Sequence, residues 1–121
     1  MKIHAQYDPS VPFDGNVVYG MASAYTLVQA LQASGKNLTR QGLVKAVEQF
    51  GSGWKGPGLV PFRYSTSLHG GYGGAEMGQV RGGKIVLFGG PLVTDPTASS
   101  PITASHGTQP APPANGIPPT P

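Results

Sequence analysis

The C-terminal quarter of the chain limits what the rest can fold into. From Pro91 to Pro121 nearly every residue is Pro, Thr, Ala, Ser or Gly. Such a segment buries too little apolar surface to offset the entropy of ordering its backbone. We therefore expect residues 91–121 to form a disordered tail, above all beyond Pro96. Residues 1–90 must then hold any folded core, which places that core near the lower end of the usual range of domain sizes.

An amphipathic helix is predicted over residues 16–34. Its apolar side chains recur at spacings of three and four, which places them on one face of a helix. This stripe, which we expect to pack in the core, consists of Val17, Met21, Ala24, Val28 and Leu31. Asp14 or Asn16 can supply the N-cap oxygen, and Gly35 suits the left-handed position that ends a helix.

A second, shorter helix is predicted to begin after Thr39, whose hydroxyl makes a suitable N-cap. Leu38 and Leu43 have the spacing of a hydrophobic staple. The capping box is incomplete, because Gly42 stands where Glu or Gln would reach back to the N-cap. Apolar residues then follow helical spacing as far as Phe50, and a Gly-Ser-Gly step ends the helix.

After the second helix the pattern becomes that of strands. Residues 59–64 are a short β candidate, although Pro61 restricts them to an edge or an irregular strand. Residues 76–81 and 84–88 flank Gly82-Gly83, a two-residue link that suits a tight hairpin turn with positive φ. We expect an α/β arrangement with the two helices side by side and the hairpin beside them. Two helices and a hairpin leave apolar faces uncovered, so this geometry predicts a larger partner.

The residue types argue against catalysis, a metal site and a nucleic-acid partner. The formal net charge is only +3, and Lys and Arg are scattered singly rather than gathered in a basic stripe. His4, His69 and His106 lack the spacing of metal ligands, and the chain contains no cysteine. No carboxylates are paired, and no serine stands in a nucleophile elbow. We therefore predict that the protein is not an enzyme and has no catalytic residues, metal or cofactor.

The N-terminal residues do not have the features of a signal peptide. They contain no apolar run of about seven residues and no small-residue cleavage site. No apolar stretch approaches the roughly 20 residues that cross a bilayer. We expect no direct membrane insertion and, for the chain as written, a cytoplasmic location.

Several features follow one another along the chain in a characteristic order. After the helix that ends at Gly35 come residues 37–47 with their Thr cap, residues 58–62, the His-Gly-Gly step of residues 69–71, and residues 79–84 with their Gly-Gly turn. In this order they resemble the C-terminal end of the type I periplasmic solute-binding proteins, the branched-chain amino acid receptor group that feeds ABC importers. The resemblance runs from about Pro12 to about Phe88.

This resemblance implies a partial type I periplasmic-binding-protein fold. In that fold two α/β lobes are joined by three crossing segments, and the ligand lies between the lobes. Residues 1–90 would be the C-terminal segment of a leucine-binding-protein-like domain. The complete receptor would be extracytoplasmic, bind an amino acid or a related small solute, and deliver it to an ABC permease. Because the chain would lack most of both lobes, we expect it not to be binding-competent alone.

Two residues near the start of the first helix are candidate ligand contacts. The family has a Gly-Tyr-Asp-Ala-like step there, and this chain has Gly20-Met21-Ala22-Ser23. Met21 thus stands where the resemblance places an aromatic that faces the cleft, and Tyr19 could stack on a ligand. The competing interpretations are core packing for Met21 and a ring buried on the helix flank for Tyr19.

A hinge is predicted at Gly70, Gly71, Gly73 and Gly74. The resemblance places the last inter-lobe crossing near these residues, and glycines absorb large changes in φ and ψ. An ordinary flexible loop is the competing interpretation. A phosphate cradle would need a preceding strand, a following helix and a Lys or Ser/Thr at defined spacing, which this stretch lacks. The neighbouring His69 could donate a hydrogen bond near the hinge or lie in a solvated loop.

A second function, from a different class, stays open. The chain could be a small autonomous interaction protein that uses its exposed apolar faces or its Pro-rich tail. Residues 110–113 and 118–121 have the composition that polyproline-binding domains recognise, but no Arg or Lys flanks them to orient such a ligand. A flexible extension is the competing interpretation of the tail.

Overall fold

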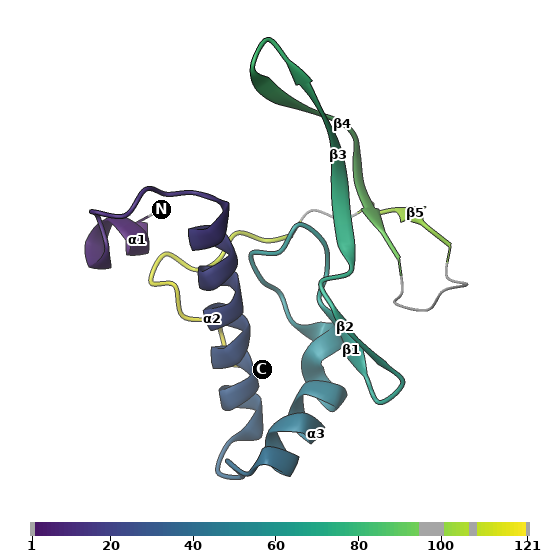
Figure 1. Cartoon of the computed structure of the whole chain (residues 1–121). Helices are drawn as coiled ribbons and strands as arrows, with labels where there is room; N and C mark the ends of the chain where they lie inside the picture. Colours follow the sequence, from purple (N-terminus) through teal and green to yellow (C-terminus); the bar gives the residue numbers. More distant parts are fainter. Residues whose placement is uncertain (1, 95–100, 107–108, 121) are drawn as a thin grey trace.

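The computed structural model describes residues 2–94, 101–106 and 109–120, which form a mixed α/β arrangement of helices and two small antiparallel sheets (Figure 1). The helical elements are α1 (Lys2–Tyr7), α2 (Gly15–Ser34), α3 (Arg40–Phe50) and the short 3₁₀ helix η1 (Gly51–Gly53). The first sheet contains β1 (Arg63–Ser65) and β2 (Leu68–Gly71). The second contains β3 (Gly74–Arg81), β4 (Lys84–Val93) and β5 (Thr103–Ala104), in that order. Within the described residues, no helix combines the length and apolarity that crossing a membrane requires.

Both predicted helices are confirmed, with their caps. The carboxylate of Asp14 accepts the backbone N–H groups of Asn16 and Val17 at 2.9 and 3.0 Å. Gly35 has a φ of 55° and donates its N–H to the carbonyl of Gln32. These contacts satisfy backbone groups that a helix end otherwise leaves without partners.

The incomplete capping box of α3 has a steric cause. Thr39 caps the helix, since its hydroxyl accepts the N–H of Gly42 at 3.0 Å. Gly42 is buried, and a Cβ there would overlap the backbone carbonyl oxygen of Asn37. A Glu or Gln at this position would therefore force the loop between α2 and α3 to move.

The core lies where α2 and α3 meet the segment that follows η1. Ala30, Trp54 and Phe62 form its centre, with Ala33, Leu43, Val47, Tyr64 and Tyr72 packed around them. Aromatic stacking organises this cluster. The ring of Phe62 stacks on Trp54 and Tyr64 at centroid distances of 5.6 and 5.9 Å, and Tyr72 meets it edge-on at 5.1 Å.

The prediction that the apolar stripe of α2 packs in the core is wrong. The buried residues of α2 are Tyr25, Gln29 and Ala30, which lie on nearly the opposite side of the helix. Of the stripe, Val28 and Leu31 are 37% and 42% exposed. The aromatic cluster packs on the other face, and Gln29 is accommodated there because its amide donates to the carbonyl of Lys55 at 2.9 Å.

Part of the stripe is instead covered by the ends of the chain. Met21, Ala24 and Val28 line a cavity of about 210 Å³ whose other walls include Ile3, Pro112 and Gly116. The sequence analysis assigned no element to α1, which contributes Ile3. In Figure 1 the C-terminal segment, coloured yellow, runs beside α2.

The predicted strand over residues 59–64 is wrong in its first four residues. The regular strand begins only at Arg63, which pairs with Gly71, and Ser65 pairs with Leu68. Pro61 has no N–H to donate to a ladder. The preceding residues contribute by burial instead: Val60 is 1% exposed and Phe62 is 8% exposed.

The hairpin around Gly82 and Gly83 is confirmed, but its predicted place beside the helices is not. Arg81 pairs with Lys84, and the two turn glycines have φ values of 57° and 75°. The ladder continues beyond an irregularity at Glu76 and reaches Val93. Figure 1 shows β3 and β4 projecting away from the helical part of the molecule.

The structure differs from the predicted disordered tail at two places. Thr103 and Ala104 form β5 and pair with Val93 and Leu92. Pro118 is buried, and its carbonyl accepts the side-chain amide of Gln32 at 3.1 Å. Backbone hydrogen bonds and proline rings provide these contacts, so they need none of the large apolar side chains that the tail lacks. Residues 95–100, 107–108 and 121 lie outside the described part.

We predict that Phe62→Ala lowers the free energy of unfolding by about 3 to 5 kcal/mol, because it removes the ring on which three aromatic neighbours pack. Urea unfolding followed by the fluorescence of Trp54, the single tryptophan, measures this loss. Phe88→Ala is the matched control, since Phe88 is 53% exposed, and should cost less than about 1 kcal/mol. Equal losses for the two variants would contradict the central role of Phe62.

We predict that Tyr25 makes the protein less stable at high pH. Burial, and to a smaller extent the nearby Tyr72, raise the pKa of Tyr25 above its usual value of 10.0. The folded state then keeps a proton that the unfolded state loses. The stability contribution is fully present below pH 10 and is lost as the pH rises toward the folded pKa, at up to about 1.4 kcal/mol per pH unit. Urea unfolding between pH 8 and pH 11 should show a smaller decline for Tyr25→Phe than for the wild type.

Candidate functional site

The largest hollow in the described structure lies between the N-terminal half of α2 and the segment that joins η1 to β1. It has a volume of about 700 Å³, and β2 and Tyr72 close one side. We call it the α2 cleft. Its lining residues are Gly15, Val18, Tyr19, Ala22, Ser23, Thr26, Pro57, Gly58, Leu59, Phe62, Gly70 and Tyr72.

Helical spacing explains the α2 wall of the cleft. Gly15, Val18, Ala22 and Thr26 follow one another at intervals of three and four, so they share one face of the helix. The opposite wall depends on Gly58. A Cβ at Gly58 would overlap the ring of Tyr72, so only glycine allows this loop to pass so close to the ring.

The hydroxyl groups of the cleft are held by bonds within the protein. Thr26 donates its hydroxyl hydrogen to the carbonyl of Ala22 at 3.0 Å, and its Oγ1 lies 3.3 Å from the hydroxyl of Tyr72. Ser23 likewise donates to the carbonyl of Tyr19 at 3.0 Å. No lining side chain carries a charge. This arrangement provides shape, aromatic surface and hydrogen-bonding oxygens, which suit binding rather than acid–base chemistry.

The two predicted ligand contacts do not meet. Tyr19 lines the α2 cleft and is 77% exposed, so its ring is available to a ligand and is not buried on the helix flank. Met21 lines the separate cavity beside α1 and the C-terminal segment. Residues two apart on a helix point to nearly opposite sides, so both side chains cannot contact one small ligand.

The predicted hinge glycines belong to strands or their junction. Gly70 lines the cleft, and Gly71, with a φ of 69°, pairs with Arg63 in the first sheet. The carbonyl of Gly73 accepts the N–H of Thr94 at 3.0 Å. A Cβ at Gly74 would overlap the side chain of Val60. Close packing and one positive φ thus account for these glycines, and an inter-lobe hinge stays a prediction.

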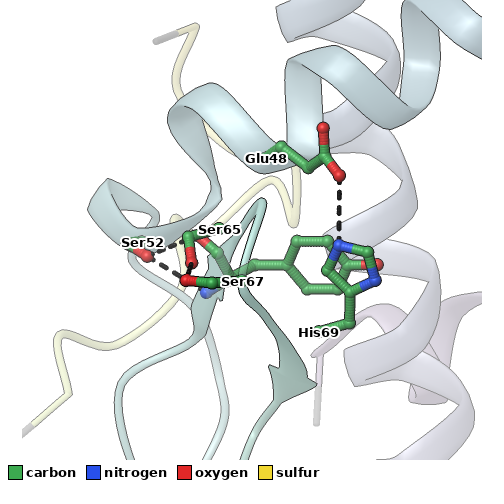
Figure 2. Close-up of polar contacts among 6 residues, drawn as sticks. Glu48, Ser52, Ser65, Ser67 and His69 are labelled. Atoms are coloured by element: carbon green, nitrogen blue, oxygen red, sulfur yellow. Dashed lines mark hydrogen bonds and ion pairs between the residues drawn. The ribbon is translucent and has the colours of Figure 1, made fainter.

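His69 is not a histidine of a solvated loop, because it lies in β2 and contacts two side chains. Its Nε2 is 3.0 Å from the carboxylate of Glu48 on α3 (Figure 2). Its ring stacks on Tyr64 at a centroid distance of 4.6 Å. The pair ties the first sheet to α3, and the His69 side chain is still 53% exposed.

The serines near this pair do not complete a catalytic triad. Ser52 accepts the N–H of Tyr64 and donates to the carbonyl of the same residue, while Ser65 and Ser67 lie 3.3 Å apart. In Figure 2 these serines gather on one side, and the His69 ring is directed to Glu48. Within the described residues, no three His, Cys, Asp or Glu side chains gather as a metal site.

The sequence analysis found Tyr19 and Gly70 but missed Thr26 and Tyr72. One signal for Thr26 was present, since it continues the helical spacing of Gly15, Val18 and Ala22. Tyr72 carried no such signal, because its place in the cleft depends on how β2 packs against Gly58.

In comparisons with known proteins, the chain matches no family model, no curated protein and no solved structure.

Proposed function

We propose that this chain is a segment of the solute-binding component of an ABC importer for amino acids or related small solutes. The order of sequence features that resembles the branched-chain amino acid receptors motivates the proposal. The α2 cleft supports it most directly: its volume of about 700 Å³ is within the range of small-molecule pockets, and Tyr19 lies in it. In the complete receptor, the partners would be the solute and an ABC permease, and the location would be extracytoplasmic.

The cleft supplies one wall of a binding site. Tyr19 is 77% exposed there, so a ligand against its ring keeps much of its own surface in water. A complete receptor would add a second lobe and enclose the ligand by closure, with Gly70, Gly71, Gly73 and Gly74 proposed to absorb the motion. A ligand that contacts both walls stabilises the closed state over the open one. One wall alone gives weak affinity.

We predict that leucine binds the isolated chain with a dissociation constant above about 1 mM, which corresponds to less than roughly 4 kcal/mol of binding free energy. Titration followed by the amide NMR signals of Gly58 and Gly70 locates and quantifies this binding. Tyr19→Ala should weaken it further. The matched control is Tyr7→Ala, because Tyr7 is also 77% exposed but lies on α1 outside the cleft.

Two outcomes would count against the proposal. A micromolar dissociation constant would show that the cleft is already a complete site. Signal changes confined to residues outside the cleft would show that it is not the site at all.

The exposed hairpin favours a second candidate, an autonomous interaction protein. Met77, Val80, Ile85, Val86, Leu87 and Phe88 are between 45% and 74% exposed. A projecting two-stranded ribbon with this much exposed apolar surface is stable only marginally unless something packs on it. The Pro-rich tail is a weaker candidate surface, because Pro118 is buried and its carbonyl is bonded to Gln32.

If the hairpin is an interaction surface, the purified chain should self-associate through it in the absence of another partner. Sedimentation velocity over a range of concentrations measures this association. Ile85→Lys should shift the population to monomer, since it places a charge on the hairpin. Leu38→Lys, at a site that is 66% exposed between α2 and α3, should leave the association unchanged. Equal effects of both lysines would indicate non-specific aggregation.

A further inference from the structure

The α2 cleft is poorly suited to a free amino acid, because none of its lining residues is charged. A free amino acid carries a carboxylate and an ammonium group at neutral pH. Moving these groups out of water without a partner of opposite charge is far more costly than moving an uncharged group. The walls therefore discriminate against zwitterions.

The start of α2 does not correct this deficit. A helix N-terminus that borders a cleft commonly attracts a carboxylate through its unpaired N–H groups. Here the side chain of Asp14 accepts the N–H groups of Asn16 and Val17 at 2.9 and 3.0 Å. Those donors are therefore used, and the negative charge of Asp14 repels a second carboxylate.

The hydroxyl groups of the cleft present acceptors. Because Thr26 donates its hydrogen to Ala22, its Oγ1 receives the hydrogen of Tyr72 in their 3.3 Å contact. The phenolic oxygen of Tyr72 then keeps lone pairs for a ligand. Ser23 has also used its hydrogen, in its bond to the carbonyl of Tyr19. A ligand that donates N–H groups matches these oxygens, whereas a carboxylate, which only accepts, does not.

We infer that the α2 cleft takes a small uncharged amide with an apolar side chain, rather than a free amino acid. The amide N–H donates to Tyr72, and the apolar part packs on the ring of Tyr19. This inference rests on the proposed solute-binding function and narrows the class of solute.

Three probes with one side chain test the inference: N-acetyl-leucinamide, leucine and N-acetyl-leucine. Titration of the full chain, followed by the amide NMR signals of Gly58 and Gly70, gives a dissociation constant for each. N-acetyl-leucinamide should bind at least tenfold more tightly than both carboxylates. Tyr72→Phe should weaken the amide by at least threefold and leave leucine unchanged, because it removes the acceptor and keeps the ring. Tyr64→Phe is the matched control, since Tyr64 belongs to the same aromatic cluster but does not line the cleft.

The outcomes separate the inference from the proposed function. Leucine binding in the cleft as tightly as N-acetyl-leucinamide would overturn the choice of amide and leave solute binding intact. An unchanged amide affinity in Tyr72→Phe would also overturn it. If none of the three probes moves the signals of Gly58 and Gly70, both the inference and the proposed solute site are wrong.

Discussion

Phe62 joins parts of the chain that no regular sheet connects. Its ring lies 5.6 Å from that of Trp54 and 5.1 Å from that of Tyr72, so it links the segment after η1 to the segment after β2. The same cluster includes Ala30 of α2, which brings the long helix against both segments. Because the strands of the first sheet are short, burial of aromatic surface supplies much of what a longer ladder would otherwise provide. This cluster therefore fixes the two walls of the α2 cleft relative to each other.

Position, rather than chemical reactivity, characterises the cleft. Tyr72 is held by Phe62 on one side and comes within 3.3 Å of Thr26 on the other. Gly58 permits the opposite wall to approach the Tyr72 ring. The hydroxyls of Thr26 and Ser23 are bonded to backbone carbonyls, so they are oriented before any ligand arrives. Such preorganised, uncharged groups favour recognition by shape and by hydrogen bonding.

Apolar surface is distributed unevenly over the molecule. The core face of α2 packs on the aromatic cluster, and Met21 on another face borders a cavity shared with Ile3 and Pro112. The β3–β4 hairpin has no comparable cover in the described structure, and Ile85 is 74% exposed. Both a missing lobe and a separate partner are consistent with an uncovered hairpin, because each would remove the same apolar side chains from water.

Local signals determined the two long helices and the hairpin turn. Asp14, Thr39 and the Gly82-Gly83 pair act on neighbours within a few residues, so their roles could be predicted from the sequence. The buried face of α2 could not, because the position of Trp54 and Phe62 decides which side of the helix is covered. The same holds for the cleft, where Tyr19 had a sequence signal but Tyr72 reaches it only through the packing of β2. Helical spacing thus defined possible faces, and contacts between distant segments decided which face became core and which became a binding surface.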